Sequence, residues 1–133
     1  MLLQNIIPFA HYLLQQTLPK GGNALDGTAG NGHDTLFLAQ TAGILGKVWA
    51  FDIQPQALTL TQCRLKEAGY ENAQLILDGH ENLKQYVSEP LDAAIFNFGW
   101  LPGGDKSLTT RTETSIPALC ATLSLLKEGG MLI

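Results

Sequence analysis

A short stretch near the start of the chain, ALDGTAGNGHDT from Ala24 to Thr35, combines residue types that bind small molecules. It holds glycines at positions 27, 30 and 32, with two aspartates and a histidine among them. Because glycine has no Cβ, a ligand can approach the backbone closely and reach its N–H groups. Bare amides beside carboxylates could bind a phosphate, a metal or another small polar molecule, so the spacing has to decide between them.

The order of the glycines separates three kinds of ligand. A Walker phosphate loop ends in Gly-Lys-Ser/Thr, whereas Gly32 is followed by His33 and Asp34. A dinucleotide loop has the order G-x-G-x-x-G, whereas this one is G-x-x-G-x-G, and Asp34 in the first turn of the next helix would repel a pyrophosphate. S-adenosylmethionine carries an ammonium, a carboxylate and a cationic sulfur. A loop that mixes acids with bare amides suits that ligand better.

Three further polar clusters follow apolar segments with the character of strands. Asp52 and Ile53 end KVWAFDI, Asp78, Gly79 and His80 follow AQLIL, and Asn97 follows LDAAIF. In a parallel sheet the carboxyl ends of the strands meet at one edge, where ligands bind. Any one of these acids could instead cap a helix. Acids at successive strand ends together predict one shared binding site.

The segments that must position these residues alternate between strand and helix along the whole chain. Strand segments are apolar and rich in β-branched and aromatic residues, and helix segments show helical spacing bounded by glycine and proline. We expect strands over 23–27, 47–53, 73–79 and 91–99 with a fifth beginning at 131, and helices over 7–18, 34–42, 55–68, 80–87 and a segment ending at 127. In the first and last helices, Pro8 and Pro117 are expected in the first turn. The alternation predicts an α/β fold, a parallel sheet with helices on both faces.

The length of 133 residues is enough for one domain. No linker or repeat interrupts the chain, so a single domain is expected over 1–133, opened by a helix within 1–20. The sequence stops two or three residues into the expected fifth strand. We therefore expect a fragment of a longer protein, truncated after strand five.

Composition and charge narrow the class of protein. The chain is 45% hydrophobic with a formal net charge of −4, which fits a globular domain and argues against a broad basic surface for nucleic-acid backbones. No apolar run approaches the ~18 residues of a membrane span, and the opening residues lack a basic start and a small-residue cleavage site. We expect a cytoplasmic protein without membrane contact, with Cys63 and Cys120 as buried, reduced thiols.

The glycine stretch resembles motif I of the class I methyltransferases, D/E-x-G-x-G-x-G, with Asp26 as the acid and Thr28 in place of the first glycine. The resemblance implies a Rossmann-like methyltransferase sheet and S-adenosyl-L-methionine as the cofactor. Asp52 would accept the ribose hydroxyls, as in other nucleotide-binding sheets, and Asp78 would border the adenine. The cofactor contacts expected on this basis are Asp26, Thr28, Gly30, Asn31, Gly32, His33, Asp34, Asp52, Ile53, Asp78, Gly79, His80 and Asn97.

The segment NFGWLPGGDK, residues 97–106, resembles the N-P-P-Y motif of amino-group methyltransferases, although Phe98 and Gly99 replace both prolines. By that resemblance Asn97 orients the amine that is methylated, and Trp100 stacks on a flat substrate group. An aliphatic amine must lose a proton before attack, and Asp105 is a candidate base. The candidate catalytic residues are therefore Asn97, Trp100 and Asp105, and the candidate substrate contacts are Trp100, Lys106 and Arg111.

Together, DGTAGNGHDTLFLA and NFGWLPGGDK are similar to a narrower family, the small bacterial proteins labelled rRNA methylases. Members act as tRNA wobble-uridine methyltransferases that methylate the 5-aminomethyl group of 2-thiouridine. The resemblance implies an RNA substrate, the tRNA anticodon region. Ribosomal RNA, a small amine, or a non-catalytic nucleotide-binding module are the alternatives. No metal site is expected from the spacing of the three histidines, and the oligomeric state stays open, a homodimer included.

Overall fold

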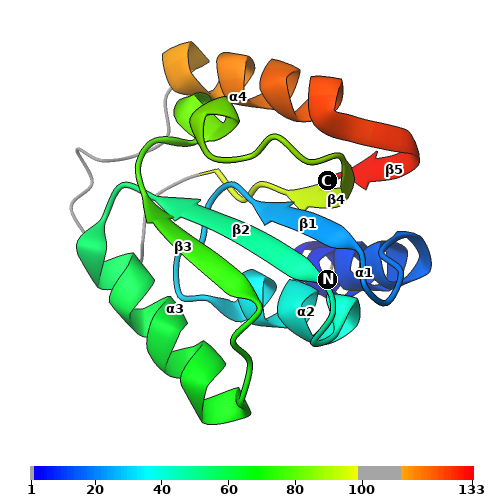
Figure 1. Cartoon of the computed structure of the whole chain (residues 1–133), viewed down its shortest axis with the longest axis vertical. Coiled ribbons are helices and arrows are strands. Elements are labelled where there is room, and N and C mark those ends of the chain that lie inside the picture. The colour runs from blue at the N-terminus through cyan, green and yellow to red at the C-terminus, as the bar shows by residue number, and fades with distance from the viewer. Residues whose placement is uncertain (1, 99–111) are drawn as a thin grey trace.

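The computed structural model describes residues 2–98 and 112–133, with the side chains of residues 2–7 and 112 left aside. Helices and strands alternate along the chain (Figure 1), as the apolar patterning predicts. Their bounds are α1 (Leu2–Thr17), β1 (Asn23–Asp26), α2 (His33–Ala42), β2 (Lys47–Asp52), α3 (Pro55–Ala68), β3 (Ala73–Leu77), the 3-10 helix η1 (His80–Gln85), β4 (Leu91–Ile95), α4 (Thr112–Leu125) and β5 (Leu126–Leu132).

All five strands are parallel and lie in the order β3-β2-β1-β4-β5. The central strand β1 pairs with β2 on one side and β4 on the other, so that Asp26 lies opposite both Ala50 and Ile95. The chain first builds outward from β1 to β3 and then returns to the other side of β1. This reversal of strand order next to β1 is where open α/β sheets bind their ligands.

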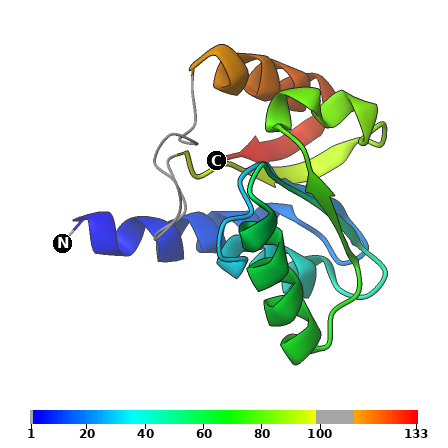
Figure 2. The same ribbon diagram turned by 90° about the vertical axis from the view of Figure 1, so that its left-hand side faces the viewer.

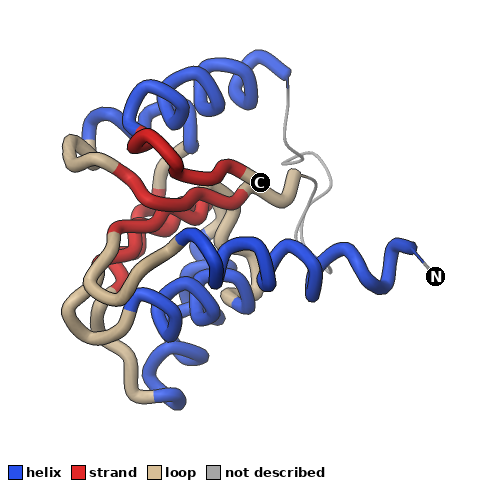
Figure 3. The backbone as a smooth tube through the Cα atoms, turned by 90° about the vertical axis from the view of Figure 1, so that its right-hand side faces the viewer, coloured by secondary structure: helices blue, strands red, loops and turns tan. Residues whose placement is uncertain are grey.

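Helices cover both faces of the sheet, which confirms the predicted α/β layers (Figures 1 and 3). Alternate strand residues point to opposite faces. Ala24 and Val48 pack in one core with residues of α1, α2 and α3. Leu25 and Trp49 pack in the other core beneath η1 and α4. Trp49 is 1% exposed, as expected for a core residue of the second strand.

Helix α1 packs against β4 and β5 and runs antiparallel to the strands, so its amino end lies near the carboxyl edge of the sheet (Figure 2). Leu14 and Leu18 anchor its carboxyl half in the core, while Phe9 and Tyr12 near the projecting half are largely exposed. Among the described helices, none combines the length and the apolar character that crossing a membrane requires.

The helix boundaries differ from the prediction mainly at prolines. Helix α1 begins at Leu2, well before residue 7, so Pro8 lies inside the helix and not in its first turn. Pro117 likewise lies inside α4. Proline removes one backbone donor but leaves the flanking hydrogen bonds intact, so packing against the sheet can carry a helix through it.

The last strand is longer than predicted because it contains a bulge. Leu126 pairs with Leu91, and Met131 pairs with Ala93. Strand β5 therefore advances five residues while β4 advances two. Gly129 supplies a φ of 82° within this irregularity, a conformation that glycine adopts without a steric penalty. The glycines thus lie within the strand instead of before it.

Both cysteines are free, as expected, but exposed, and the prediction that they are buried is wrong. The helical phase explains this. Thr61 faces the core in α3 and Thr122 does so in α4, each donating its hydroxyl proton to a carbonyl four residues earlier. Cys63 and Cys120 are each two positions away from these threonines, about 200° around the helix, and therefore face solvent.

Candidate active site

The polar clusters predicted from the sequence do lie at the carboxyl edge of the sheet. The loop after β1 is bonded to the strands on both sides. Gly27 N–H donates to Ile95 O at 3.0 Å and Ala29 N–H to Phe51 O at 2.8 Å. The ends of β1, β2 and β4 are thereby held together around one loop.

The glycine loop, residues 27–32, adopts a conformation that needs its glycines. Gly30 and Gly32 have φ angles of 55° and 86°. A Cβ on Gly32 would lie 2.7 Å from Thr61 Cα, which excludes any side chain there. Among the described residues, a Cβ on Gly30 would meet nothing nearer than Thr28 O at 3.8 Å, so none of them crowds the backbone at Gly30. The loop is therefore fixed on one side and accessible on the other.

Helix α3 holds the glycine loop through two side chains. The Thr61 hydroxyl, which donates mainly to Ala57 O at 2.9 Å, also lies 3.3 Å from Gly30 O, and Arg64 Nε donates to Asn31 O at 2.9 Å. Neither residue was predicted to act at the site. The helical spacing of Thr61 and Arg64 places them one turn apart on a common face, but which loop they meet follows only from the packing of α3.

Asp26 at the end of β1 is completely buried. Its carboxylate accepts hydrogen bonds from Thr28 N–H at 3.0 Å and from the Thr35 hydroxyl at 2.7 Å. Burial raises the pKa of Asp26 to about 7, with the nearby charges of Asp34 and Asp52 adding to the increase, while the Thr35 hydrogen bond opposes it. In the structure Asp26 shapes the loop, and its direct contact with a cofactor stays a prediction.

Asp26→Asn should flatten the pH dependence of stability between about pH 4 and pH 7. Native Asp26 keeps its proton up to about pH 7, whereas the unfolded chain releases it near 3.8. The native state therefore binds more protons in this interval, and the free energy of unfolding falls as pH rises, by up to about 4 kcal/mol. Urea unfolding of both proteins at pH 4, 5.5 and 7 measures the difference. Parallel curves would show that Asp26 titrates normally in the native state.

Asp52 at the end of β2 fastens two backbone segments while staying partly exposed. One carboxylate oxygen accepts from Gly30 N–H at 3.0 Å and the other from Gln54 N–H at 2.9 Å. Each oxygen has a second lone pair, so the carboxylate can still accept two hydroxyl donors from a ligand. The next residue, Ile53, is 48% exposed and gives an apolar surface beside it.

Asp78 after β3 is the centre of a local hydrogen-bond network. It accepts from Tyr86 Oη at 2.7 Å, Asn82 Nδ2 at 2.9 Å and Gly79 N–H at 2.7 Å. The Tyr86 hydroxyl, followed by Asn82, lowers the pKa of Asp78 below its usual value. Asp78 therefore stays ionised at neutral pH and fixes the turn that leads into η1.

His80 links η1 to the loop after β1. Its Nδ1 lies 3.0 Å from Gly27 O, and because a carbonyl only accepts, Nδ1 carries the proton. The ring packs edge-on against Phe96 and Phe98, and its buried Nε2 has no partner among the described residues. Gly79, and not His80, occupies the cap position of η1, and no side chain bonds this end of the helix.

Asn97, just after β4, is exposed and bonded both to the glycine loop and to the first turn of α2. Its backbone N–H donates to Thr28 Oγ1 at 2.6 Å, and its Nδ2 donates to Asp34 Oδ2. The other oxygen of Asp34 lies 2.7 Å from His11 Nε2, and the His11 ring is stacked on Phe37 with centroids 3.9 Å apart. Both oxygens of Asp34 thus engage protein groups, whereas the amide oxygen of Asn97 has no hydrogen-bond partner among residues 2–98 and 112–133.

The structure brings most of the predicted site residues to one edge. Asn97 contacts Thr28, Asp52 contacts Gly30, and His33 begins α2 with an exposed side chain. The candidates Trp100, Asp105, Lys106 and Arg111 lie outside the described residues. Sequence reasoning missed His11, Thr61 and Arg64 as part of this site, because they reach it across 23, 31 and 33 positions of the chain. It also missed Thr35, which bonds Asp26 from only nine positions away.

The hydrogen-bond acceptors at this edge suit a ligand with hydroxyl or cationic groups better than they suit a polyphosphate. The carboxylates of Asp34 and Asp52 lie close enough to Asp26 to raise its pKa, and they would repel a dense anion. Open backbone at Gly30 beside the acceptors of Asp52 fits a ribose with its hydroxyls. In 2–98 and 112–133 no three potential metal ligands lie close enough to hold an ion.

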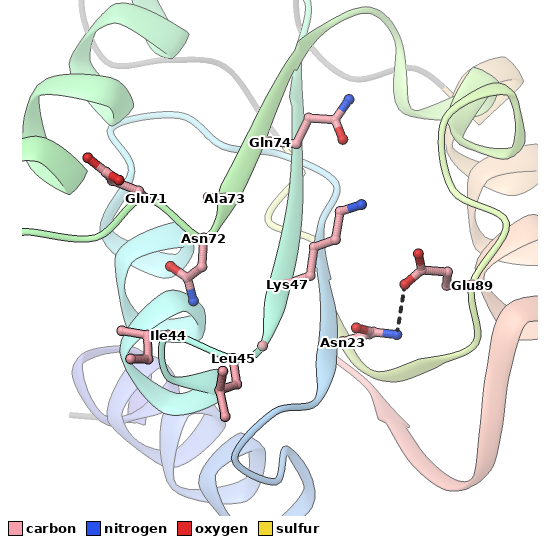
Figure 4. Close-up of a pocket in the computed structure, with 10 residues that line it drawn as sticks. Asn23, Ile44, Leu45, Lys47, Glu71, Asn72, Ala73, Gln74 and Glu89 are labelled. Atoms are coloured by element: carbon pink, nitrogen blue, oxygen red, sulfur yellow. Dashed lines mark hydrogen bonds between the residues drawn. The ribbon is translucent and has the colours of Figure 1, made fainter.

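A hollow of about 470 Å³ lies at the opposite, amino edge of the sheet (Figure 4). Its walls include Lys47, whose ammonium lies 4.6 Å from the Trp49 ring centroid, and the exposed Ile44 and Leu45. None of the residues discussed above lines it. This hollow is therefore distinct from the edge where the polar clusters converge.

The parallel sheet, the glycine loop after β1 and the acids at the ends of β2 and β3 define a Rossmann-like class I methyltransferase fold. The chain belongs to the family described as "Putative rRNA methylase", whose family model matches residues 48–133.

Relatives of known structure share both the fold and much of the sequence. An rRNA methylase structure from Clostridium thermocellum has a TM-score of 0.92 and 39% identity over 95% of this chain and 68% of its own. A methyltransferase from Streptococcus mutans, solved in complex with SAH, has a TM-score of 0.87 and 45% identity over 95% of this chain and 69% of its own.

A curated relative from Arabidopsis thaliana is named "tRNA (mnm(5)s(2)U34)-methyltransferase, chloroplastic". It is 35% identical over a match that covers 92% of this chain. The chain spans 49% of the length of this relative.

Proposed function

We propose that this protein transfers a methyl group from S-adenosyl-L-methionine to an amine of an RNA nucleotide. The observation that carries the proposal is the placement of Asn97 beside the glycine loop, with its amide nitrogen engaged by Asp34 and its amide oxygen unpartnered within the described part of the chain. An amide oxygen accepts a hydrogen bond from an amine and directs the nitrogen lone pair elsewhere.

The residues at the carboxyl edge fit the proposed cofactor. When bound, S-adenosylmethionine supplies an electrophilic methyl group on a positively charged sulfur. Asp52 would accept its ribose hydroxyls, Ile53 and the Asp78–Gly79 turn would flank the adenine, and Gly30 would let the amino-acid end approach the backbone. The Streptococcus mutans relative, solved in complex with SAH, supports this assignment.

The substrate we propose is the 5-aminomethyl group of a wobble 2-thiouridine in tRNA. The name of the Arabidopsis relative supports this choice. In this assignment Asn97 holds the amine, Trp100 stacks on the base, Asp105 takes the proton that the amine must lose, and Lys106 and Arg111 contact phosphates of the anticodon region. Residues 1–133 form the cofactor-binding domain. We propose that the protein acts in the cytoplasm, as a monomer or a homodimer.

Calorimetric titration of the 133-residue chain with S-adenosylmethionine, with NAD as the control, tests the cofactor. We expect binding of the first alone. The same titration on the protein as its gene encodes it serves as the reference. Binding of NAD, or of neither ligand by the gene-encoded protein, would contradict the assignment.

Transfer of a radioactive methyl group tests the substrate. We expect incorporation into tRNA that carries 5-aminomethyl-2-thiouridine, no incorporation into the same tRNA transcribed without modification, and an apparent affinity that falls as salt rises. Incorporation into ribosomal RNA, or into a free amine with no dependence on salt, would replace the proposed substrate. Cofactor binding without transfer to any of these would indicate a binding module.

A further inference from the structure

We infer that His11 is a positioning residue for methyl transfer, acting through Asp34 on the amide of Asn97. This inference rests on the proposed function of Asn97. Three elements that are distant in the chain contribute one residue each, from α1, from the first turn of α2 and from the segment after β4.

Asp34 decides which way the Asn97 amide faces. A carboxylate can only accept hydrogen bonds, so the Asn97 NH2 group turns toward Asp34 and the amide oxygen turns away from it. The backbone N–H of Asn97 is separately held by Thr28 Oγ1. The side chain therefore has one favoured orientation before any substrate arrives, which is the condition for productive alignment of an amine.

His11 in turn fixes Asp34. Its Nε2 lies 2.7 Å from Asp34 Oδ1, so the carboxylate is held from both sides. The His11 ring lies nearly parallel to Phe37, with 8° between the planes, and cannot rotate without losing this stacking. The side chains of His11 and Asp34 are 23% and 14% exposed, so water screens their contact only partly.

The same chain of hydrogen bonds also acts electrostatically. As the amine nitrogen attacks the methyl carbon, the nitrogen–carbon bond forms, the carbon–sulfur bond breaks and the nitrogen becomes positive. Donation of the Asn97 NH2 to a carboxylate polarises the amide and makes its oxygen a stronger acceptor. The positive charge on nitrogen is then stabilised where it develops, which lowers the barrier without tightening binding of the neutral amine.

Two substitutions at His11 separate its hydrogen bond from its packing. His11→Phe keeps an aromatic ring against Phe37 but removes the donor to Asp34, whereas His11→Gln removes the ring but keeps a donor. We expect His11→Phe to lower kcat about 10- to 50-fold, with KM for tRNA and Kd for the cofactor within about twofold of the wild type. His11→Gln should recover most of kcat. Equal losses of kcat in both variants would overturn the inference, as would a loss confined to KM.

A spectroscopic measurement decides the inference independently of activity. The side-chain NH2 resonances of Asn97, assigned by their loss in Asn97→Ala, should shift in His11→Phe and return toward the wild-type positions in His11→Gln. Thermal unfolding verifies that both variants are folded. Unchanged Asn97 resonances in His11→Phe overturn the inference even if the wild type is active. An inactive wild type with shifted resonances overturns the proposed function instead.

Discussion

Asn97→Ala should lower the rate of methyl transfer by about 100- to 1000-fold while leaving the cofactor Kd within about twofold, the range seen when a group that stabilises developing charge is removed. Alanine retains the backbone N–H that donates to Thr28 Oγ1, so the segment after β4 keeps its attachment to the glycine loop. What is lost is the amide that Asp34 orients. The amine then enters the site without an acceptor that aligns it.

The measurement compares single-turnover methyl transfer to the modified tRNA with calorimetric binding of the cofactor. Asn82→Ala is the matched control, because Asn82 donates to Asp78 at the same edge of the sheet but does not contact the Asn97 network. We expect its transfer rate to stay within about threefold of the wild type once cofactor is saturating. Parallel losses of rate and cofactor affinity in Asn97→Ala would refute a catalytic role.

Asp52→Ala should weaken S-adenosylmethionine binding by about 100-fold or more. A charged acceptor contributes about 1.5–3 kcal/mol for each hydrogen bond it accepts, and Asp52 has room for two ribose hydroxyls. The variant also frees Gly30 N–H and Gln54 N–H, which lose their acceptor. Asp52→Asn keeps one oxygen acceptor and should fall between the wild type and Asp52→Ala.

A ligand without ribose hydroxyls separates direct contact from damage to the loop. The wild type should bind the 2′,3′-dideoxy cofactor product much more weakly than the intact product, whereas Asp52→Ala should bind the two about equally. Calorimetry on the four combinations gives the coupling energy. If removal of the hydroxyls costs as much in the variant as in the wild type, the ribose is held by another residue.

The sequence was sufficient to predict which residues gather at the site, for a physical reason. Asp26, Asp52 and Asn97 lie at or just after the ends of apolar strands, and any parallel sheet brings those ends to one edge. Their gathering needed no knowledge of how helices pack. The layers follow from the same logic, because strands that are apolar throughout must be covered on both faces.

The sequence could not predict the side-chain contacts that orient Asn97. His11 meets Asp34 across 23 positions of the chain and Asn97 meets it across 63. Both contacts depend on the depth and rotation with which α1 and α2 pack, which no periodicity specifies. The burial of the cysteines was predicted wrongly because that prediction relied on residue type and not on helical phase. Cysteine is usually buried, but the phase of α3 buries the hydroxyl of Thr61 and exposes Cys63.

The path of α1 has a consequence for the order in which the domain assembles. This helix precedes every described strand in the chain, yet it packs against β4 and β5, and Thr17 Oγ1 lies 3.9 Å from Met131 Sδ, 114 positions later. Closing so long a separation is entropically expensive until the intervening strands have paired. We expect α1 to dock late on the ribosome, after β1 to β3 have formed. His11 would then reach Asp34 only as the sheet is completed, so a nascent chain could bind cofactor before it acquires the oriented Asn97.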